Sequence, residues 1–255
     1  MELIYLLDGF HWSNLLQPQF YIENGGLWLI LFVVFAETGL FVGFFLPGDS
    51  LLFVTGIFAH EITTKAGEVR LGLGYQFLKL FGMGPGYSYW IDLFILTGLI
   101  SVAGILGNSV GYWTGRKVGP SMFEWRDRFL FRKKYLYQAQ EFYAKNGGGA
   151  IVVARFLPII RTFAPIVAGI VRMERKKFHF FNVVGCIAWV LTMIFAGFFL
   201  QKWIYKQWGF DLKEHLEIIV LGIVLVTTAP VLIKIFTGKK PPPKDIPPSA
   251  DNTLP

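Results

Sequence analysis

The chain has 255 residues, of which 54% are hydrophobic and 17% aromatic, and it carries a formal net charge of +7. Its mean hydropathy of +0.50 excludes an ordinary soluble domain and indicates a polytopic membrane protein with one membrane domain. The basic residues cluster between hydrophobic segments, as membrane orientation requires, so we expect no nucleic-acid partner. The single cysteine, Cys186, excludes an internal disulfide and a cysteine-rich metal site.

The N-terminal segment 1–24 contains no lysine or arginine, so it lacks the basic region that begins a cleaved signal peptide. Its apolar residues instead predict a helix that lies in the membrane interface. These residues are Leu3, Ile4, Leu6, Leu7, Phe10, Trp12, Leu15 and Leu16.

Five hydrophobic stretches make up a predicted membrane domain over 25–236. They lie at about 25–59, 90–114, 149–170, 178–201 and 215–236. The second, fourth and fifth are each long enough to cross a membrane as one helix. The remaining segment, 237–255, is rich in proline and polar residues, and we expect a disordered cytoplasmic tail there.

The first and third stretches are interrupted by proline. Pro47 and Gly48 interrupt the first, because proline lacks a hydrogen-bond donor and glycine frees the backbone. Pro158 and Pro165 interrupt the third, which is too short to cross and return. We therefore predict that both stretches form re-entrant hairpins, with these four residues at the breaks or tips.

Lysine and arginine counts in the connecting segments predict the orientation. The segments 116–148, 171–177 and 234–255 carry eight, four and four, whereas 1–24, 60–89 and 202–214 carry none, three and three. The positive-inside rule places the first set, including the C-terminus, in the cytoplasm. This assignment holds only if each broken stretch returns to the side it entered.

The fold class that follows is an all-α polytopic membrane protein. It has two opposed re-entrant helical hairpins in an inverted repeat, about three full transmembrane helices and an N-terminal interfacial helix. A short repeat agrees with this, since Phe45-Leu46-Pro47 matches Phe156-Leu157-Pro158. Inverted-repeat transporters place their site near the membrane midplane, between the repeats.

Four charged residues lie within the two broken stretches. Glu37 and Asp49 flank the first break, and Arg155 and Arg161 flank the second. Charge at membrane depth is costly and usually marks a transport pathway. The acids could take up and release protons, and the arginines offer the planar fork that suits phosphate oxygens. The alternative is that the four charges form only structural ion pairs that hold the hairpins together.

Other polar residues carry less functional signal. Asn108 could line the cavity, but a hydrogen bond between helices is the more common role of such a residue. No pair of the four histidines has zinc-ligand spacing, so we assign no metal and no other cofactor. No catalytic motif is present, and we expect a transporter, not an enzyme, with no catalytic residues.

The combined motifs resemble the DedA family, which is related to the eukaryotic VTT-domain (SNARE-associated) membrane proteins. The resemblance covers about 25–200. Asn108 departs from it, since many relatives carry aspartate there. The matching residues are Glu37-Thr38-Gly39, Leu46-Pro47-Gly48-Asp49-Ser50-Leu51-Leu52, Gly111-Tyr112-Trp113, Gly115-Arg116, Gly119, Gly147, Arg155-Phe156-Leu157-Pro158, Arg161-Thr162, Pro165, Ala168-Gly169, Met173, Phe178, Asn182, Gly185 and Trp189.

This resemblance implies flipping of a phosphate-bearing lipid, undecaprenyl phosphate or a phospholipid, across the bacterial cytoplasmic membrane and driven by the proton-motive force. The partners implied are that lipid and protons, and a homo-oligomer is compatible with the sequence. Residues matching Glu37, Asp49, Arg155 and Arg161 are thought essential in the family. Two alternatives remain open: a proton-coupled exporter or antiporter of small molecules or cations, and an envelope assembly factor without transport.

Overall fold

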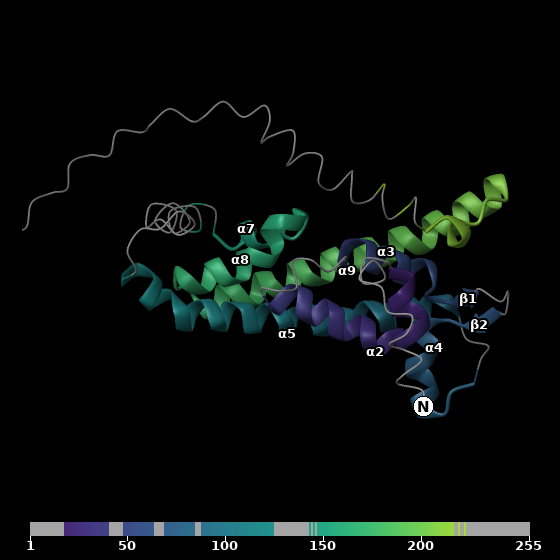
Figure 1. Ribbon diagram of the computed structural model, residues 1–255, viewed down its shortest axis with the longest axis horizontal. Coiled ribbons are helices and arrows are strands. Elements are labelled where there is room, and N and C mark those ends of the chain that lie inside the picture. The colour runs from purple at the N-terminus through teal and green to yellow at the C-terminus, as the bar shows by residue number, and fades with distance from the viewer. Residues whose placement is uncertain are drawn as a thin grey trace, which may run out of the picture.

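The computed structural model describes residues 18–40, 48–63, 69–84, 88–124, 143, 145, 147–216, 219 and 222. This part of the chain is helical apart from one small two-stranded ribbon (Figure 1). The helices are α2 (Pro18–Gly39), α3 (Gly48–Ile57), α4 (Leu73–Leu78), α5 (Tyr89–Glu124), α7 (Gly149–Ala154), α8 (Pro158–Ile170) and α9 (Arg175–Trp208), with short 3-10 turns η3 (Lys79–Phe81) and η4 (Leu212–His215).

Two long helices, α5 and α9, form the axis of the fold and run antiparallel. Tyr89 at the start of α5 stacks on Phe198 near the end of α9, and Tyr112 further along α5 stacks on Phe178 near the start of α9. Both helices are long and apolar enough to cross a membrane, judged by length and composition. They contain the predicted membrane helices 90–114 and 178–201. α5 also continues past the apolar stretch to Glu124.

The two proline-interrupted stretches each contain a pair of shorter helices. The first holds α2, which is kinked at Gly26 (φ 54°), and the 10-residue α3. The second holds the 6-residue α7 and the 13-residue α8, separated by an extended Leu157. At about 1.5 Å per residue, α3, α7 and α8 are all too short to cross a hydrocarbon core of about 30 Å.

The packing of these pairs on the long helices follows one rule. In each pair the first helix packs on the long helix that follows it, α2 on α5 and α7 on α9. The first half of the fold consists of α2, α3 and α5, and the second half of α7, α8 and α9. The second helix of each pair packs on the long helix of the other half, α3 on α9 and α8 on α5. Glycines permit both exchanged contacts, because a Cβ at Gly197 would overlap the backbone of Phe53 and one at Gly115 would overlap that of Ile166. The two halves therefore bury each other's second helices.

The connection between α3 and α5 contains a short helix that packs on α5 and α2. Strands β1 (Glu61–Thr63) and β2 (Val69–Leu71) pair antiparallel, and α4 follows them (Figure 1). Gln76 of α4 accepts a hydrogen bond from the backbone N–H of Leu27, beside the kink of α2, at 2.9 Å. The ribbon was not among the sequence predictions, because strands of three residues are too short to give an alternating pattern.

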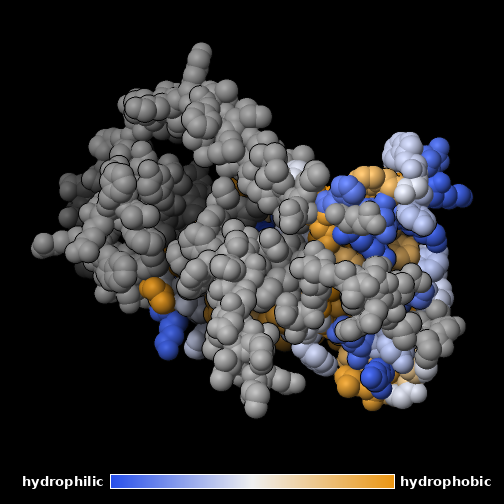
Figure 2. Space-filling model, turned by 45° about the vertical axis from the view of Figure 1, so that its right-hand side comes forward, coloured by the Kyte–Doolittle hydropathy of each residue, from blue (hydrophilic) through white to orange (hydrophobic). Residues whose placement is uncertain are grey.

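The core lies between the two halves, and many large apolar side chains remain on the surface. Leu51, Leu96, Trp189 and Ile194 are fully buried. Hydrophobic side chains also lie exposed on the outside of the described part (Figure 2). On α5 and α9 these include Phe94, Leu106, Trp113, Phe180 and Trp203. Such a surface suits a lipid environment and not water.

Three sequence predictions fall largely outside the described residues. The interfacial helix predicted over 1–24 is described only from 18 on, where the chain already belongs to α2. Of the predicted membrane helix 215–236, the structure describes residues 215, 216, 219 and 222. The predicted disordered tail, 237–255, lies outside the described residues.

Candidate functional site

Helix ends from both interrupted stretches meet in the centre of the fold. Glu37 lies in the last turn of α2, Asp49 in the first turn of α3, and Arg161 in the first turn of α8. Each of these positions lies next to a point where a helix begins or ends. The structure therefore brings together side chains that are 112 and 124 residues apart in sequence.

Arg161 bridges the two acids. Its Nη1 donates to Asp49 Oδ1 and its Nη2 donates to Glu37 Oε1, so that each half of the guanidinium fork binds a different carboxylate. Glu37 is 2% exposed and Arg161 8% exposed. A buried ion pair contributes little stability relative to apolar packing, but loss of one partner leaves an uncompensated charge and costs about 3–5 kcal/mol.

Gly48 makes room for this cluster. A Cβ at position 48 would overlap the Glu37 carboxylate, so the acid lies directly against the backbone at the start of α3. Only glycine permits this approach without displacing Glu37. The absence of a side chain at position 48 thus has a direct packing reason.

Trp189 on α9 packs against the cluster. Its Nε1 donates a hydrogen bond to Asp49 Oδ1 at 2.9 Å. The guanidinium carbon of Arg161 lies 4.9 Å from the centre of the Trp189 ring, and that of Arg155 lies 6.0 Å from it. An aromatic ring at such distances attracts a cation through its negative face. Trp189 therefore contacts both arginines and one of the acids.

Arg155 has different partners. It is 4% exposed and donates from Nη2 to Asn182 Oδ1. Within the part of the chain that is described, Arg155 forms no salt bridge to a carboxylate. Asn182 also accepts a hydrogen bond from Asn108 Nδ2 at 2.9 Å and donates to the Ile105 carbonyl at 3.3 Å. Arg155 is thus a buried cation held by a neutral amide.

The structure places the predicted site residues as follows. Glu37, Asp49 and Arg161 lie in one cluster, and Arg155 lies beside it through the shared Trp189 ring. Asn108 makes a hydrogen bond between α5 and α9, the more common role of such a residue, although its partner Asn182 also binds Arg155.

The predicted breaks need one correction. Gly48 begins α3 and Pro158 begins α8, while Pro47 lies outside the described residues. Pro165 does not break the chain, because α8 continues through it to Ile170. A proline inside a helix lacks the N–H that would bond the carbonyl four residues earlier, here that of Arg161, and its ring crowds that carbonyl. α8 nevertheless continues through Pro165, and it packs on α5.

Sequence reasoning assigned no site role to Trp189 or Asn182. Asn182 carried a signal of its own, as a polar residue inside an apolar stretch, and such residues usually bind a partner. Trp189 gave no comparable signal, because a tryptophan in an apolar helix is most often a core residue. Among the described residues, no group of three or more His, Cys, Asp or Glu could hold a metal ion.

Comparison with known proteins supports the family resemblance that the sequence motifs indicate. Residues 46–199 match the VTT domain family. The chain is 34% identical to Protein DedA of Escherichia coli K12 over 94% of its own length and 97% of that protein. It is 31% identical to an uncharacterized membrane protein of Mycobacterium leprae, over 88% of each chain.

A third relative is the inner membrane protein YqjA of Escherichia coli K12, which is 30% identical over 84% of this chain and 86% of that protein. No solved structure matches the chain. The domain match covers more than half of the chain, and the relatives align over nearly their full length. The protein therefore belongs to the DedA family of VTT-domain membrane proteins.

Proposed function

We propose that the protein flips a lipid with a phosphate headgroup, undecaprenyl phosphate or a phospholipid, across the bacterial cytoplasmic membrane. The main support is that one buried arginine, Arg161, binds two carboxylates from the other half of the fold. A guanidinium suits phosphate as well as carboxylate, so a lipid phosphate can replace the acids. No covalent bond changes, and the protein acts as a transporter.

The proposed topology has two re-entrant hairpins, α2–α3 from the outer side and α7–α8 from the cytoplasmic side. The shortness of α3, α7 and α8 supports it, as does the distribution of basic residues between the two sets of loops. In this topology the C-terminus is cytoplasmic. With α3 packed on α9 and α8 on α5, Arg161 lies at the contact between the two halves. The proposed cycle moves these halves relative to each other, as in other inverted-repeat transporters.

Charge balance in the cluster suggests how protons enter the cycle. Glu37 and Asp49 carry two negative charges when ionised, and Arg155 and Arg161 carry two positive charges. Protonation of one acid leaves a net positive charge, which favours an anion at a buried site. A proton and a singly charged headgroup that enter together therefore keep the site neutral. This balance couples lipid movement to the proton-motive force.

The two arginines have different tasks in this scheme. Arg161 alternates between the carboxylates and the lipid phosphate, because its partners are charged and replaceable. Arg155 offers a constant positive charge, because Asn182 is neutral. The lipid tail stays in the bilayer while the headgroup passes the two cations.

Two other functions fit the cluster less well. A cation exporter needs free carboxylates, but Arg161 binds both acids and the two arginines repel a cation. An assembly factor without transport would use the four charges only as structural ion pairs. It would then need no change of charge at the site, so a Glu37→Gln variant that remains folded would keep its function.

The test is a lipid-sidedness assay in proteoliposomes with Arg155→Lys and Arg161→Lys variants. Lysine keeps the charge but loses the planar fork, so Arg161→Lys cannot present paired donors in fixed positions to the carboxylates or to a phosphate. We expect Arg161→Lys to lose most translocation while it still elutes as a folded protein. Lys176→Gln, an exposed residue in the first turn of α9, is the control. Normal translocation by both arginine variants would refute the proposed phosphate role.

A further inference from the structure

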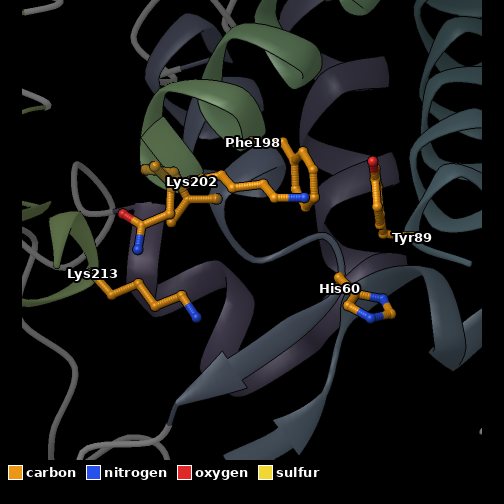
Figure 3. A pocket seen from close by; sticks show the side chains of 7 residues that line it. His60, Tyr89, Phe198, Lys202 and Lys213 are labelled. Carbon is orange, nitrogen blue, oxygen red and sulfur yellow. The ribbon is translucent and has the colours of Figure 1, made fainter. Parts of the chain in front are cut away.

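A second basic site lies at the opposite end of α3 from Asp49. A cavity of about 220 Å³ is lined there by residues from four parts of the chain, including His60 after α3, Tyr89 at the start of α5, Lys202 near the end of α9 and Lys213 in η4 (Figure 3). Ile57, which also lines it, is eight residues beyond Asp49 on α3, or about 12 Å along the helix. The cavity is therefore separate from the central cluster.

Two lysines give the cavity its positive charge. Lys202 and Lys213 both line it, and Lys213 points towards the space beside His60 (Figure 3). The Lys202 ammonium lies 4.4 Å from the centre of the Tyr89 ring, and that of Lys213 lies 5.8 Å from the centre of the Phe58 ring. Aromatic faces hold a cation without neutralising it.

Two acids near the pocket, Asp92 and Asp211, have partners of their own in the described part of the chain. Neither lysine forms a salt bridge with a carboxylate among the described side chains. His60 Nδ1 lies 2.7 Å from Asp92 Oδ2, so that acid has a basic partner of its own. Asp211 Oδ1 accepts hydrogen bonds from the Gln201 side chain at 2.8 Å and from the backbone of Lys213 at 2.9 Å. Since no described carboxylate neutralises either ammonium group, both can bind an anion.

The size of the cavity limits its ligand. At about 220 Å³ it is smaller than the roughly 300–1,000 Å³ of pockets that enclose drug-sized ligands. It can hold a phosphate group with a small substituent, but not a whole lipid. Lipid chains would have to lie outside, along apolar surface such as the exposed Trp90, Phe94 and Phe199 near Tyr89.

We propose that this cavity, which we call the lysine pocket, binds a phosphate-bearing anion through Lys202 and Lys213. The ligand is either the headgroup of a lipid or free phosphate, and both share the same chemistry. The choice of phosphate over other anions rests on the proposed function. The anion site itself rests on two lysines that line one cavity and pair with no described carboxylate. In the proposed topology the pocket lies at the outer end of α9, where a lipid waits before it reaches Arg161.

The experiment measures equilibrium binding to the full chain in nanodiscs of phosphatidylcholine, without any gradient. The probes are dihexanoyl phosphatidylglycerol and inorganic phosphate. The Lys202→Gln/Lys213→Gln variant is compared with Lys79→Gln/Lys206→Gln, which removes the same charge from two exposed lysines outside the pocket. We expect the pocket variant to bind each probe at least about tenfold more weakly than wild type, and the control variant to bind as wild type does.

Each outcome decides a separate point. Equal binding by the two variants overturns the lysine pocket. Loss of phosphatidylglycerol binding without measurable phosphate binding assigns the site to a lipid headgroup. Loss of phosphate binding that in the wild type is tighter than phosphatidylglycerol binding assigns it to free phosphate. A Lys202→Arg/Lys213→Arg variant that restores binding excludes misfolding as the cause of the loss.

Failure of the pocket and failure of the proposed function can be told apart. Arg161→Lys leaves the lysine pocket unchanged, so it should lose translocation and keep the binding that depends on Lys202 and Lys213. Binding that depends on the lysines, in a protein that translocates no lipid, would leave the anion site standing and remove the proposed function.

Discussion

Trp189 donates its indole N–H to the carboxylate of Asp49 across 2.9 Å, so a residue of α9 orients an acid at the start of α3. The same oxygen of Asp49 also accepts from Arg161. The tryptophan thus fixes one of the two acids on which Arg161 depends. This contact joins α9 of the second half to α3 of the first half.

Replacement of Trp189 by phenylalanine keeps an aromatic ring and removes the hydrogen bond. A hydrogen bond to a charged group contributes about 1.5–3 kcal/mol, so we expect translocation to fall roughly 10- to 100-fold. The proteoliposome assay measures this. Trp203→Phe is the control, because Trp203 lies on the same helix but is 55% exposed. Equal rates for the two variants would show that the bond to Asp49 has no role in transport.

Substitutions of Asn182 distinguish a role of Arg155 in stability from a role in transport. Asn182→Ala removes the acceptor of Arg155 and should lower the free energy of unfolding by about 1–3 kcal/mol. Asn182→Asp keeps an acceptor and adds a carboxylate that neutralises Arg155, so we expect a stable protein with little translocation. Thermal unfolding in detergent and lipid transport are measured in parallel. Full transport by a stable Asn182→Asp variant would contradict the role of Arg155 as a constant positive charge.

Gly48→Ala tests the close approach of Glu37 to the backbone. The new methyl group would overlap the carboxylate, and we expect a destabilisation of about 1–3 kcal/mol together with loss of transport. Gly98→Ala is the matched control, because a Cβ there meets nothing within 4 Å. If both alanine variants transport lipid at the wild-type rate, Glu37 does not need its place against α3.

Glu37→Gln tests proton coupling. The amide keeps the shape of the acid but cannot change its charge, so we expect the remaining translocation to be independent of an imposed pH gradient. Rates are compared with and without the gradient in wild type and variant. A Glu37→Gln protein that still responds to the gradient as wild type does would assign coupling to other groups.

The orientation of the two hairpins is open to chemical labelling. A Lys79→Cys variant should react with a membrane-impermeant maleimide added outside intact cells, whereas Lys176→Cys should react only after lysis. Both positions are exposed, and the native Cys186 is buried. Labelling of both positions from one side would contradict the proposed topology.

Sequence could predict the cluster in outline because its parts are unusual for their surroundings. Charges and prolines inside apolar stretches are costly, so the sequence alone indicates Glu37, Asp49, Arg155 and Arg161 as site residues. Sequence could not predict that Arg161 would take both acids while Arg155 took none. That difference depends on where each helix begins: Arg161 lies in the first turn of α8, whereas Arg155 follows the end of α7.

Other features required tertiary packing. Trp189 and Asn182 join the site only because α9 packs against α3 and α7, and no local pattern states which helices will pack. Pro165 shows the reverse case, since a residue that usually ends a helix lies inside α8. The lysine pocket likewise arises only when η4 meets the ends of α3, α5 and α9.

The central claim is that Arg161 leaves its two carboxylates to bind a lipid phosphate. The most direct measurement is the affinity for dihexanoyl phosphatidic acid, in a Lys202→Gln/Lys213→Gln background that removes the lysine pocket. If the acids and the phosphate compete, Glu37→Gln/Asp49→Asn should bind this lipid more tightly than the background protein. Addition of Arg161→Ala should then abolish the gain. Equal affinity with and without the two acids would contradict the account.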